Sequence, residues 1–477
     1  MCEKFKNVPE LMPELRTLFK SQNDKLSYYD MFQFIKNKLE IELQNWEEDA
    51  LEGRLDRLGM AFIEFNEFNE FSLEYGLNWK EPLAENDLED ILDAKINLSY
   101  KDYTVTEADY FQGCPTMLNN EKAALATVRK IYKSMKKAKQ TEFIDPDFGA
   151  KDKNDDIGHR YSLYRQGVVP QKGYPEPEKC QWAFAEQLCD SGEKVQFVND
   201  GVGASDCQQG QIGDCWLISA LSIVANKDSL IIGGRTGMEY DPEMIVDKEI
   251  ALLLCNGLYP PIFHKYRTRG LFVIRVYKNF KWIYVITDER VPAEMRKDPD
   301  DETKPEKLQP IFGQCKDPQE TWVAMIEKAY AKIHGCYGNL ISGYIDEGVQ
   351  ELTGFQPEKI IIRNEKTGCF PHQMIEQHYG GKEGFWKFLM DRQNEGCLLG
   401  CSIKGNGKVG QLMLDGTNTG LILNHAYGIN DVMEITDKED PKRPLKIMRL
   451  RNPWGHTEWE GAWSENSKEF AKYMSVI

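Results

Sequence analysis

One helix-length stretch of the sequence, WLISALSIVA at residues 216–225, is apolar on nearly every side. A helix with this pattern has no polar face that could be exposed to water, so it has to be buried in a core. The chain has 477 residues and a mass of 55.0 kDa, enough for two to four compact units that each bury a core. The sequence therefore predicts a globular protein built around a buried helix, and it argues against a disordered, collagenous or coiled-coil chain.

The loop before this helix, QGQIGDC, carries two glycines and ends on Cys215. We expect a helix to begin there, with its N-terminal end and Cys215 reaching a surface or cleft. Unpaired N–H groups and the positive end of the helix dipole stabilise an anion at that position, which favours a thiolate. A cysteine that opens a buried helix is also a common core residue, so the loop alone does not assign a reaction.

Two downstream segments supply the groups that a cysteine nucleophile needs. His425 lies in NHAYG, within a strand pattern, and Asn452 lies in RNPWG, at the end of another strand pattern. A nucleophilic thiol requires an imidazole to take its proton and return it to the leaving group, and a third residue to orient that imidazole. The side chain of Gln209 and the backbone N–H of Cys215 could bind the oxyanion. Taken alone, His425 could be a hydrogen-bonded core histidine and Asn452 a turn residue before proline.

Charge and composition exclude several classes of function. Acidic residues outnumber basic ones by 76 to 59, which gives a net charge of −17. This balance repels nucleic acid and anionic lipid heads unless basic residues cluster, and we expect no nucleic-acid partner. No run of about 18 apolar residues occurs and the start lacks a signal-peptide pattern, so we expect no membrane span and a cytoplasmic location. The 12 cysteines and 7 histidines form neither a disulfide framework nor a zinc-spaced cluster, and reduced thiols are expected.

The predicted secondary structure changes along the chain. Residues 1–100 are predicted to be helical, and residues 101–139 to be a connection that ends in a basic helix, VRKIYKSMKKAKQ, with a solvated face. From residue 140 the pattern is mixed α and β. The segments that we predict as strands are LFVIRVY, KWIYVITD, KIIIR, GLILNHAYGI and LKIMRLR.

From residue 143 to the C-terminus the sequence resembles the catalytic core of the calpain family. The resemblance is carried by QGQIGDCW, NHAYGIN and RLRNPWGHTEWEGAWS, and by further stretches such as FVNDGVGASDCQQG and TWVAMIEKAYAKIHGCYG. It implies an α+β, papain-like protease of two subdomains, 140–343 with the cysteine and 344–477 with the histidine and asparagine. The second subdomain is short at its C-terminal end. A lysosomal papain-type enzyme and a transglutaminase fit the sequence less well.

The resemblance also assigns roles to residues. Cys215 would be the nucleophile, His425 the acid and base, Asn452 its orienting group and Gln209 the oxyanion donor. Trp454 matches the tryptophan that shields the histidine and asparagine. Substrate-cleft positions are Asn424, which replaces a glycine, and Ser342 and Gly343 of a turn whose next residue, Tyr344, also replaces a glycine.

Calcium is the cofactor that the resemblance implies, and no organic cofactor is expected. In the first subdomain Asp206 stands at the carboxylate position and Asn199 and Gly201 at carbonyl positions, while Gly338 replaces an acidic residue. In the second subdomain Glu458 matches, and Glu465 stands where aspartate is usual. The ligand set is thus matched only in part.

The N-terminal region resembles a degenerate pair of EF-hands. Segments 19–30 and 56–67 each end on an acidic residue and have Leu26 and Ile63 at the central apolar position of an EF-hand loop. Few oxygen ligands are present, because Leu58 and Met60 occupy ligand positions and Ala61 stands where glycine makes the turn. We therefore favour a structural pair without metal over a working calcium sensor.

Two functions from different classes follow. The first is a cytoplasmic, calcium-dependent-type thiol protease that cuts protein substrates at a limited number of sites. The second is a calpain-fold scaffold with weak or no activity that binds proteins of the cytoskeleton or cilium. The complete Cys-His-Asn set favours the protease.

Overall fold

The computed structural model describes most of the chain after residue 102 and a few residues before it. Within 103–474 the described residues exclude 153, 169, 171, 190–194, 200, 234–256, 298–302, 304–305, 363–371, 406–409, 415–416, 438–439, 441 and 456–457. Before residue 103 they are 18, 25–27, 34, 37–38 and 62–64. The chain divides into two compact units, Met1–Ser99 with Arg235–Tyr240, and Tyr100–Gly234 with Asp241–Ile477.

In the first unit two short strands are described. β1 (Lys25–Ser27) pairs antiparallel with β2 (Phe62–Glu64), with Leu26 opposite Ile63. These are the two central positions of the EF-hand-like segments. Most of region 1–100 lies outside the described residues, so its all-helical character and its resemblance to EF-hands stay predictions.

Four strands of the second unit form an antiparallel sheet in the order β3-β4-β8-β7. Its strands are β3 (Tyr110–Phe111), β4 (Cys114–Leu118), β7 (Leu271–Lys278) and β8 (Lys281–Asp288). β7 and β8, both predicted, are joined through Asn279 and Phe280, each at positive φ, as a tight hairpin turn requires. Residues 101–139 are more than a connection, because they add β3 and β4 to the sheet and place α6 (Glu121–Ala138) against it.

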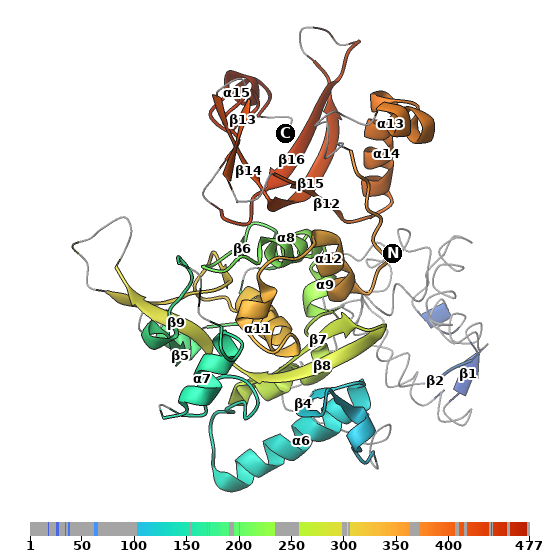
Figure 1. The fold of residues 1–477 in the computed structure, drawn as a ribbon. Helices are drawn as coiled ribbons and strands as arrows, with labels where there is room; N and C mark the ends of the chain where they lie inside the picture. Colours follow the sequence, from blue (N-terminus) through green and yellow to red (C-terminus); the bar gives the residue numbers. More distant parts are fainter. Residues whose placement is uncertain are drawn as a thin grey trace. The chain divides into compact units, whose positions relative to one another are not determined.

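Three further helices lie on the side of this sheet opposite α6 (Figure 1). They are α8 (Cys215–Val224), α11 (Trp322–Ile333) and α12 (Ile345–Thr353). Every residue of α8 after Cys215 is buried, as its apolar sequence predicts. α11 is also buried throughout, and its Lys328 and Lys332 are ion-paired with Asp288 (2.5 Å) and Asp145 (2.6 Å).

The first part of this unit also holds small elements around the core. The helices are α7 (Asp156–Leu163), α9 (Ser229–Ile232) and the 3-10 turns Glu107–Asp109, Pro177–Lys179, Ala185–Gln187, Pro261–Arg269 and Tyr337–Leu340. The strands are β5 (Gln181–Ala183), β6 (Cys207–Gln208), β9 (Val291–Arg296), β10 (Lys307–Pro310) and β11 (Gln314–Cys315). They form a β10-β9-β5 sheet and a β11-β6 pair.

The C-terminal part is built on an antiparallel sheet in the order β12-β15-β16. Its strands are β12 (Leu399–Ile403), β15 (His425–Ile435) and β16 (Leu445–Arg451), beside a hairpin of β13 (Gly410–Leu414) and β14 (Thr417–Leu423). The helices are α13 (His372–Tyr379), α14 (Lys382–Asn394) and α15 (Lys468–Tyr473). The predicted mixed α and β architecture is confirmed.

One predicted strand is wrong. The β-branched segment KIIIR is irregular as far as residue 362, and Ile361 and Ile362 are 57% and 42% exposed. Strand propensity measures how well a side chain packs on neighbouring strands. Residues 359–362 lie in no sheet of the structure, so their β-branched side chains do not form a strand.

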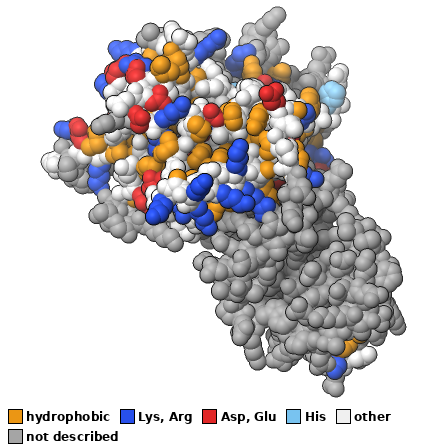
Figure 2. Space-filling view, turned by 90° about the horizontal axis from the view of Figure 1, so that it is seen from below, with side chains coloured by type: hydrophobic (Ala, Val, Ile, Leu, Met, Phe, Trp, Pro, Cys, Tyr) orange, Lys and Arg blue, Asp and Glu red, His pale blue; other side chains and the backbone are white. Residues whose placement is uncertain are grey.

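The basic stretch of α6 is exposed to solvent, as expected. Lys130, Lys133, Lys136 and Lys137 are exposed, whereas the apolar side of the helix, including Leu125 and Val128, is buried. The face seen in Figure 2 shows Lys and Arg side chains gathered over this helix. None of the described helices combines the length and the apolar character that a bilayer span requires.

Candidate active site

The loop that precedes α8 is held by close contacts at its glycines. A Cβ atom at Gly210 would lie 2.4 Å from the backbone of Phe312, so only glycine fits there. The carbonyl of Gly213 accepts a hydrogen bond from the N–H of Ser342 (3.0 Å), and the indole N–H of Trp216 donates to the carbonyl of Leu340 (2.8 Å). These contacts fix the backbone on both sides of Cys215.

Cys215 is the first residue of α8 and is half-buried. Burial raises the pKa of its thiol, and the charge of Asp214 raises it further. The backbone N–H groups of Ala426, Trp216 and Cys215 itself act in the opposite direction. The helix start thus favours the thiolate as the sequence indicates, but burial outweighs it and keeps the pKa of the thiol above its usual range.

His425 and Asn452 come together as the sequence predicts. His425 opens β15 and is 3% exposed, and Asn452 directly follows β16, which pairs with β15. The Nε2 of His425 is 2.8 Å from the Oδ1 of Asn452. This contact makes Nε2 the protonated nitrogen and leaves Nδ1 to exchange a proton. Burial lowers the pKa of His425, and the hydrogen bond with Asn452 opposes that effect.

The structure brings the strand of His425 to the helix of Cys215. The backbone N–H of Ala426, the residue after His425, lies close enough to the Cys215 sulfur to lower the pKa of the thiol. The hydroxyl of Ser219 in α8 donates to the carbonyl of Ala426 (2.9 Å). Ser219 was not selected from the sequence, although a serine inside an otherwise apolar helix is a usable signal.

Trp454 covers the histidine. Its ring centroid lies 4.6 Å from that of His425, and its backbone N–H donates to the Oδ1 of Asn452 (3.1 Å). The same loop reaches the first half of the site, because the carbonyl of Pro453 accepts a hydrogen bond from the N–H of Gln209 (2.9 Å). Trp454 therefore shields the His-Asn hydrogen bond from water.

Gln209 is the first residue of the loop that leads to Cys215. Its Nε2 donates to the carbonyl of Ile212 (2.6 Å), and its Oε1 is buried with no hydrogen-bond partner among the described residues. An amide can donate two hydrogens, so one remains for an oxyanion while the other holds this contact.

The predicted cleft residues have constrained backbones. Asn424 and Ser342 have φ of 54° and 67°, the left-handed region that glycine adopts most easily. The Oδ1 of Asn424 accepts from the N–H of Gly405 (2.9 Å), which ties the side chain to the end of β12. A Cβ at Gly343 would lie 2.3 Å from the Trp216 ring, whereas Tyr344 is 59% exposed, with Lys359 over its ring.

The side chains of the first candidate set of calcium ligands take part in hydrogen bonds within the protein. The carboxylate of Asp206 accepts the N–H of Gly203 (2.7 Å), and the amide of Asn199 donates to Asp317 (3.3 Å). At Gly338 a Cβ would lie 2.7 Å from the Tyr164 ring, so the structure leaves no room for the missing acidic side chain. Calcium takes six to eight oxygen ligands, which this set does not offer.

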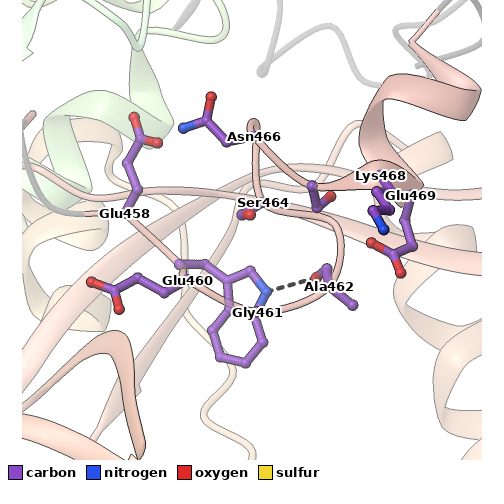
Figure 3. Close-up of a pocket in the computed structure, with 10 residues that line it drawn as sticks. Glu458, Glu460, Gly461, Ala462, Ser464, Asn466, Lys468 and Glu469 are labelled. Carbon is purple, nitrogen blue, oxygen red and sulfur yellow. Dashed lines mark hydrogen bonds between the residues drawn. The ribbon is translucent and has the colours of Figure 1, made fainter.

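In the second candidate set, Glu458 lines a cavity of about 710 Å³, whereas Glu465 is not among the residues that line it. Figure 3 shows Glu458, Glu460 and Glu469 around this cavity, with their carboxylates apart from one another. Glu458 and Glu465 are both exposed. Within the described ranges, no three Asp, Glu, His or Cys side chains form a group that could hold a metal ion. Calcium binding by these residues therefore stays a prediction.

Comparison with known proteins agrees with this geometry. Residues 143–475 match the profile of the family described as "Calpain family cysteine protease". The chain is 28% identical to rat Calpain-8 over 298 residues, which are 62% of this chain and 34% of the rat protein. It is 29% identical to mouse Calpain-5 over 352 residues, which are 72% of this chain and 46% of the mouse protein.

A third relative is the bovine Calpain-2 catalytic subunit, 26% identical over 288 residues, or 60% of this chain and 32% of the bovine protein. The chain thus spans less than half the length of these relatives. The family match covers the predicted interval from residue 143 almost to the C-terminus, and it includes Cys215, His425 and Asn452. By this match over more than half of its length, the chain belongs to the calpain family of cysteine proteases.

Proposed function

We propose that the protein is a cysteine endopeptidase in which Cys215, His425 and Asn452 form the catalytic triad. The observation that carries the proposal is the His425–Asn452 hydrogen bond of 2.8 Å, on a strand whose next residue, Ala426, accepts a hydrogen bond from Ser219 of the Cys215 helix. The three groups come from separate parts of the sequence and are of the types that thiol catalysis requires.

In the proposed reaction, the sulfur of Cys215 attacks the carbonyl carbon of a peptide bond while Nδ1 of His425 accepts the thiol proton. Burial keeps Cys215 and His425 neutral at rest, because it raises the pKa of the thiol and lowers that of the imidazole. Proton transfer therefore accompanies attack. The imidazolium that forms is held by Asn452 through Nε2 and is shielded by Trp454.

The carbonyl oxygen becomes an oxyanion, which the Cys215 backbone N–H and the Gln209 amide stabilise. His425 then returns its proton to the leaving amine as the C–N bond breaks, which leaves a thioester on Cys215. Water, deprotonated by His425, attacks the thioester, and the carboxylic acid product leaves as the thiol is restored.

Calcium takes no part in this scheme, since the described Asp, Glu, His and Cys side chains form no cluster of three that could hold a metal ion. Regulation by calcium, which the resemblance implies, is a separate proposal. Its test is a comparison of turnover in millimolar calcium and in chelator.

The test of the protease proposal uses an unstructured protein as substrate, because an extended chain can enter a cleft without first unfolding. Wild type is expected to give a small set of discrete fragments by gel and mass spectrometry, and Cys215→Ala is expected to give none. Cys397→Ala removes an exposed cysteine elsewhere and is the matched control. Fragments of equal yield from the Cys215→Ala protein would refute the assignment.

A second candidate is a calpain-fold scaffold that binds proteins of the cytoplasm, cytoskeleton or cilium. It is favoured by Gly338, where the Tyr164 ring leaves no space for the usual acidic side chain, and by the neutral resting state of the site. Absence of fragments from folded wild type, with and without calcium, would favour this candidate over the protease.

A further inference from the structure

Two buried carboxyl groups lie directly behind the proposed nucleophile. Asp214 caps the start of α8 immediately before Cys215 and is 0% exposed. Glu327, in the middle of α11, is 1% exposed. The proposed reaction uses neither residue.

The two carboxyls lie within hydrogen-bond reach of each other, because each of them shifts the pKa of the other. The N–H of Gly313 donates to both oxygens of Glu327, at 2.9 and 3.0 Å, and a Cβ at Gly313 would lie 3.0 Å from that carboxyl. At normal hydrogen-bond geometry, neither oxygen of Asp214 accepts from an N–H group or from a Ser, Thr or Tyr hydroxyl of the described residues, although the Gln209 side chain lies nearby. Two carboxyl oxygens can share a hydrogen bond only if one of them carries a proton.

No lysine or arginine of the described residues is among the groups that shift the pKa of either carboxyl. Lys328, the next residue of α11, turns to Asp288 and to the backbone carbonyl of Arg290, both at 2.5 Å. On the neighbouring 3-10 turn, Tyr337 is held neutral, because burial and the charges of Glu327, Asp288 and Asp214 raise its pKa. Two ionised carboxylates in such a site would repel each other strongly, so one proton stays between them.

The proton resides mainly on Glu327. Burial raises the pKa of Asp214 to about 6. The neighbouring Glu327 and Gln209 side chains act in the opposite direction and lower it. Burial and the charge of Asp214 raise the pKa of Glu327 well above its usual range. Near neutral pH the pair therefore carries one negative charge, located on Asp214 and adjacent to Cys215.

We propose that Asp214 and Glu327 share a single proton and that the charge they retain sets the pH at which Cys215 becomes a reactive thiolate. Asp214 is then a positioning residue that acts through Cys215. Only the role of Cys215 as nucleophile rests on the proposed function. The proton sharing itself rests on the burial and contacts of the two carboxyls.

The test is the pH dependence of Cys215 alkylation by iodoacetamide, followed site by site through peptide mass mapping. Asp214→Asn removes the charge next to the sulfur, so the profile should move to lower pH by about one pH unit, as for removal of a close like charge. Glu327→Gln keeps a hydrogen-bond donor for Asp214 and leaves that residue charged, so the profile should not move to lower pH.

Glu320→Gln is the matched control. Glu320 is a buried carboxyl that accepts the N–H of Asn199, and its charge acts on Cys315 instead of Cys215. Its profile should coincide with that of wild type. Superposed profiles for wild type and Asp214→Asn, or equal downward shifts in Asp214→Asn and Glu327→Gln, would overturn the proposal.

A second measurement covers the case in which Asp214→Asn does not fold. The infrared carbonyl band of a protonated carboxyl should be present in wild type at neutral pH and weaker in Glu327→Gln, and an unchanged band would overturn proton sharing. The two proposals fail separately. A shifted alkylation profile without proteolysis would reject only the protease, and proteolysis with superposed profiles would reject only the carboxyl pair.

Discussion

Replacing Asn452 by alanine removes one acceptor atom that serves two donors. Its Oδ1 is 2.8 Å from Nε2 of His425 and 3.1 Å from the N–H of Trp454. With His425 3% exposed, water does not easily replace the lost acceptor. An orphaned buried donor costs about 1–3 kcal/mol. If this cost is added to the activation free energy of the Cys215 reaction, the reaction rate should fall about 5- to 150-fold, since about 1.4 kcal/mol is a factor of ten.

The assay is the second-order rate of Cys215 modification by a papain-type epoxide, which requires an aligned imidazole and no knowledge of the substrate. Asn466→Ala, at an exposed asparagine on the cavity of Figure 3, is the matched control and should react like wild type. Circular dichroism would establish that both variants are folded. A folded Asn452→Ala protein that reacts at the wild-type rate would refute the role given to Asn452.

Three further predictions concern stability. Gly343→Ala places a Cβ 2.3 Å from the Trp216 ring, so its melting temperature should fall, and an unchanged value would contradict the packing. Lys328→Met removes one of the buried ion-pair partners of Asp288 and should lower the free energy of unfolding in urea by about 3 kcal/mol. The same substitution at an exposed lysine of α6 should change it little. Folding raises the pKa of Asp214 from 3.8 to about 6, so the stability it contributes is complete below about pH 4 and is lost as the pH rises through 6. Unfolding at a series of pH values should show this decline in wild type and a flatter curve in Asp214→Asn.

Elements with a strong local pattern were predictable from the sequence. The segments KWIYVITD and LKIMRLR coincide with β8 and β16, and the apolar stretch after Cys215 forms the buried helix α8. Their side chains meet a sheet or a core on the faces that the pattern indicates. The segment KIIIR has a similar strand propensity, but its isoleucines have no partner strand. Whether a partner strand is present depends on the rest of the fold and cannot be read from the segment itself.

The part of the candidate site that could be predicted consists of residues whose type alone indicates a chemical role. Cys215, His425 and Asn452 could be identified because few residue types can act as nucleophile, as acid and base, or as the group that orients the imidazole. The Asp214–Glu327 pair and the buried Lys328 were not predicted, because charged residues are mostly exposed and their burial depends on partners distant in sequence. The same limit applies to calcium, since positions that match a ligand pattern do not by themselves bring oxygens together.

Covalent labelling of Cys215 is the most direct test of the central claim that this chain carries a working thiol site. A papain-type epoxide is added to the folded protein, with calcium or with chelator, and the modified residue is identified by intact mass and peptide mapping. The account predicts one adduct on Cys215 that is lost in Cys215→Ala and retained in Cys397→Ala. Wild type that is folded and unlabelled in both conditions, or labelled elsewhere, would contradict the account.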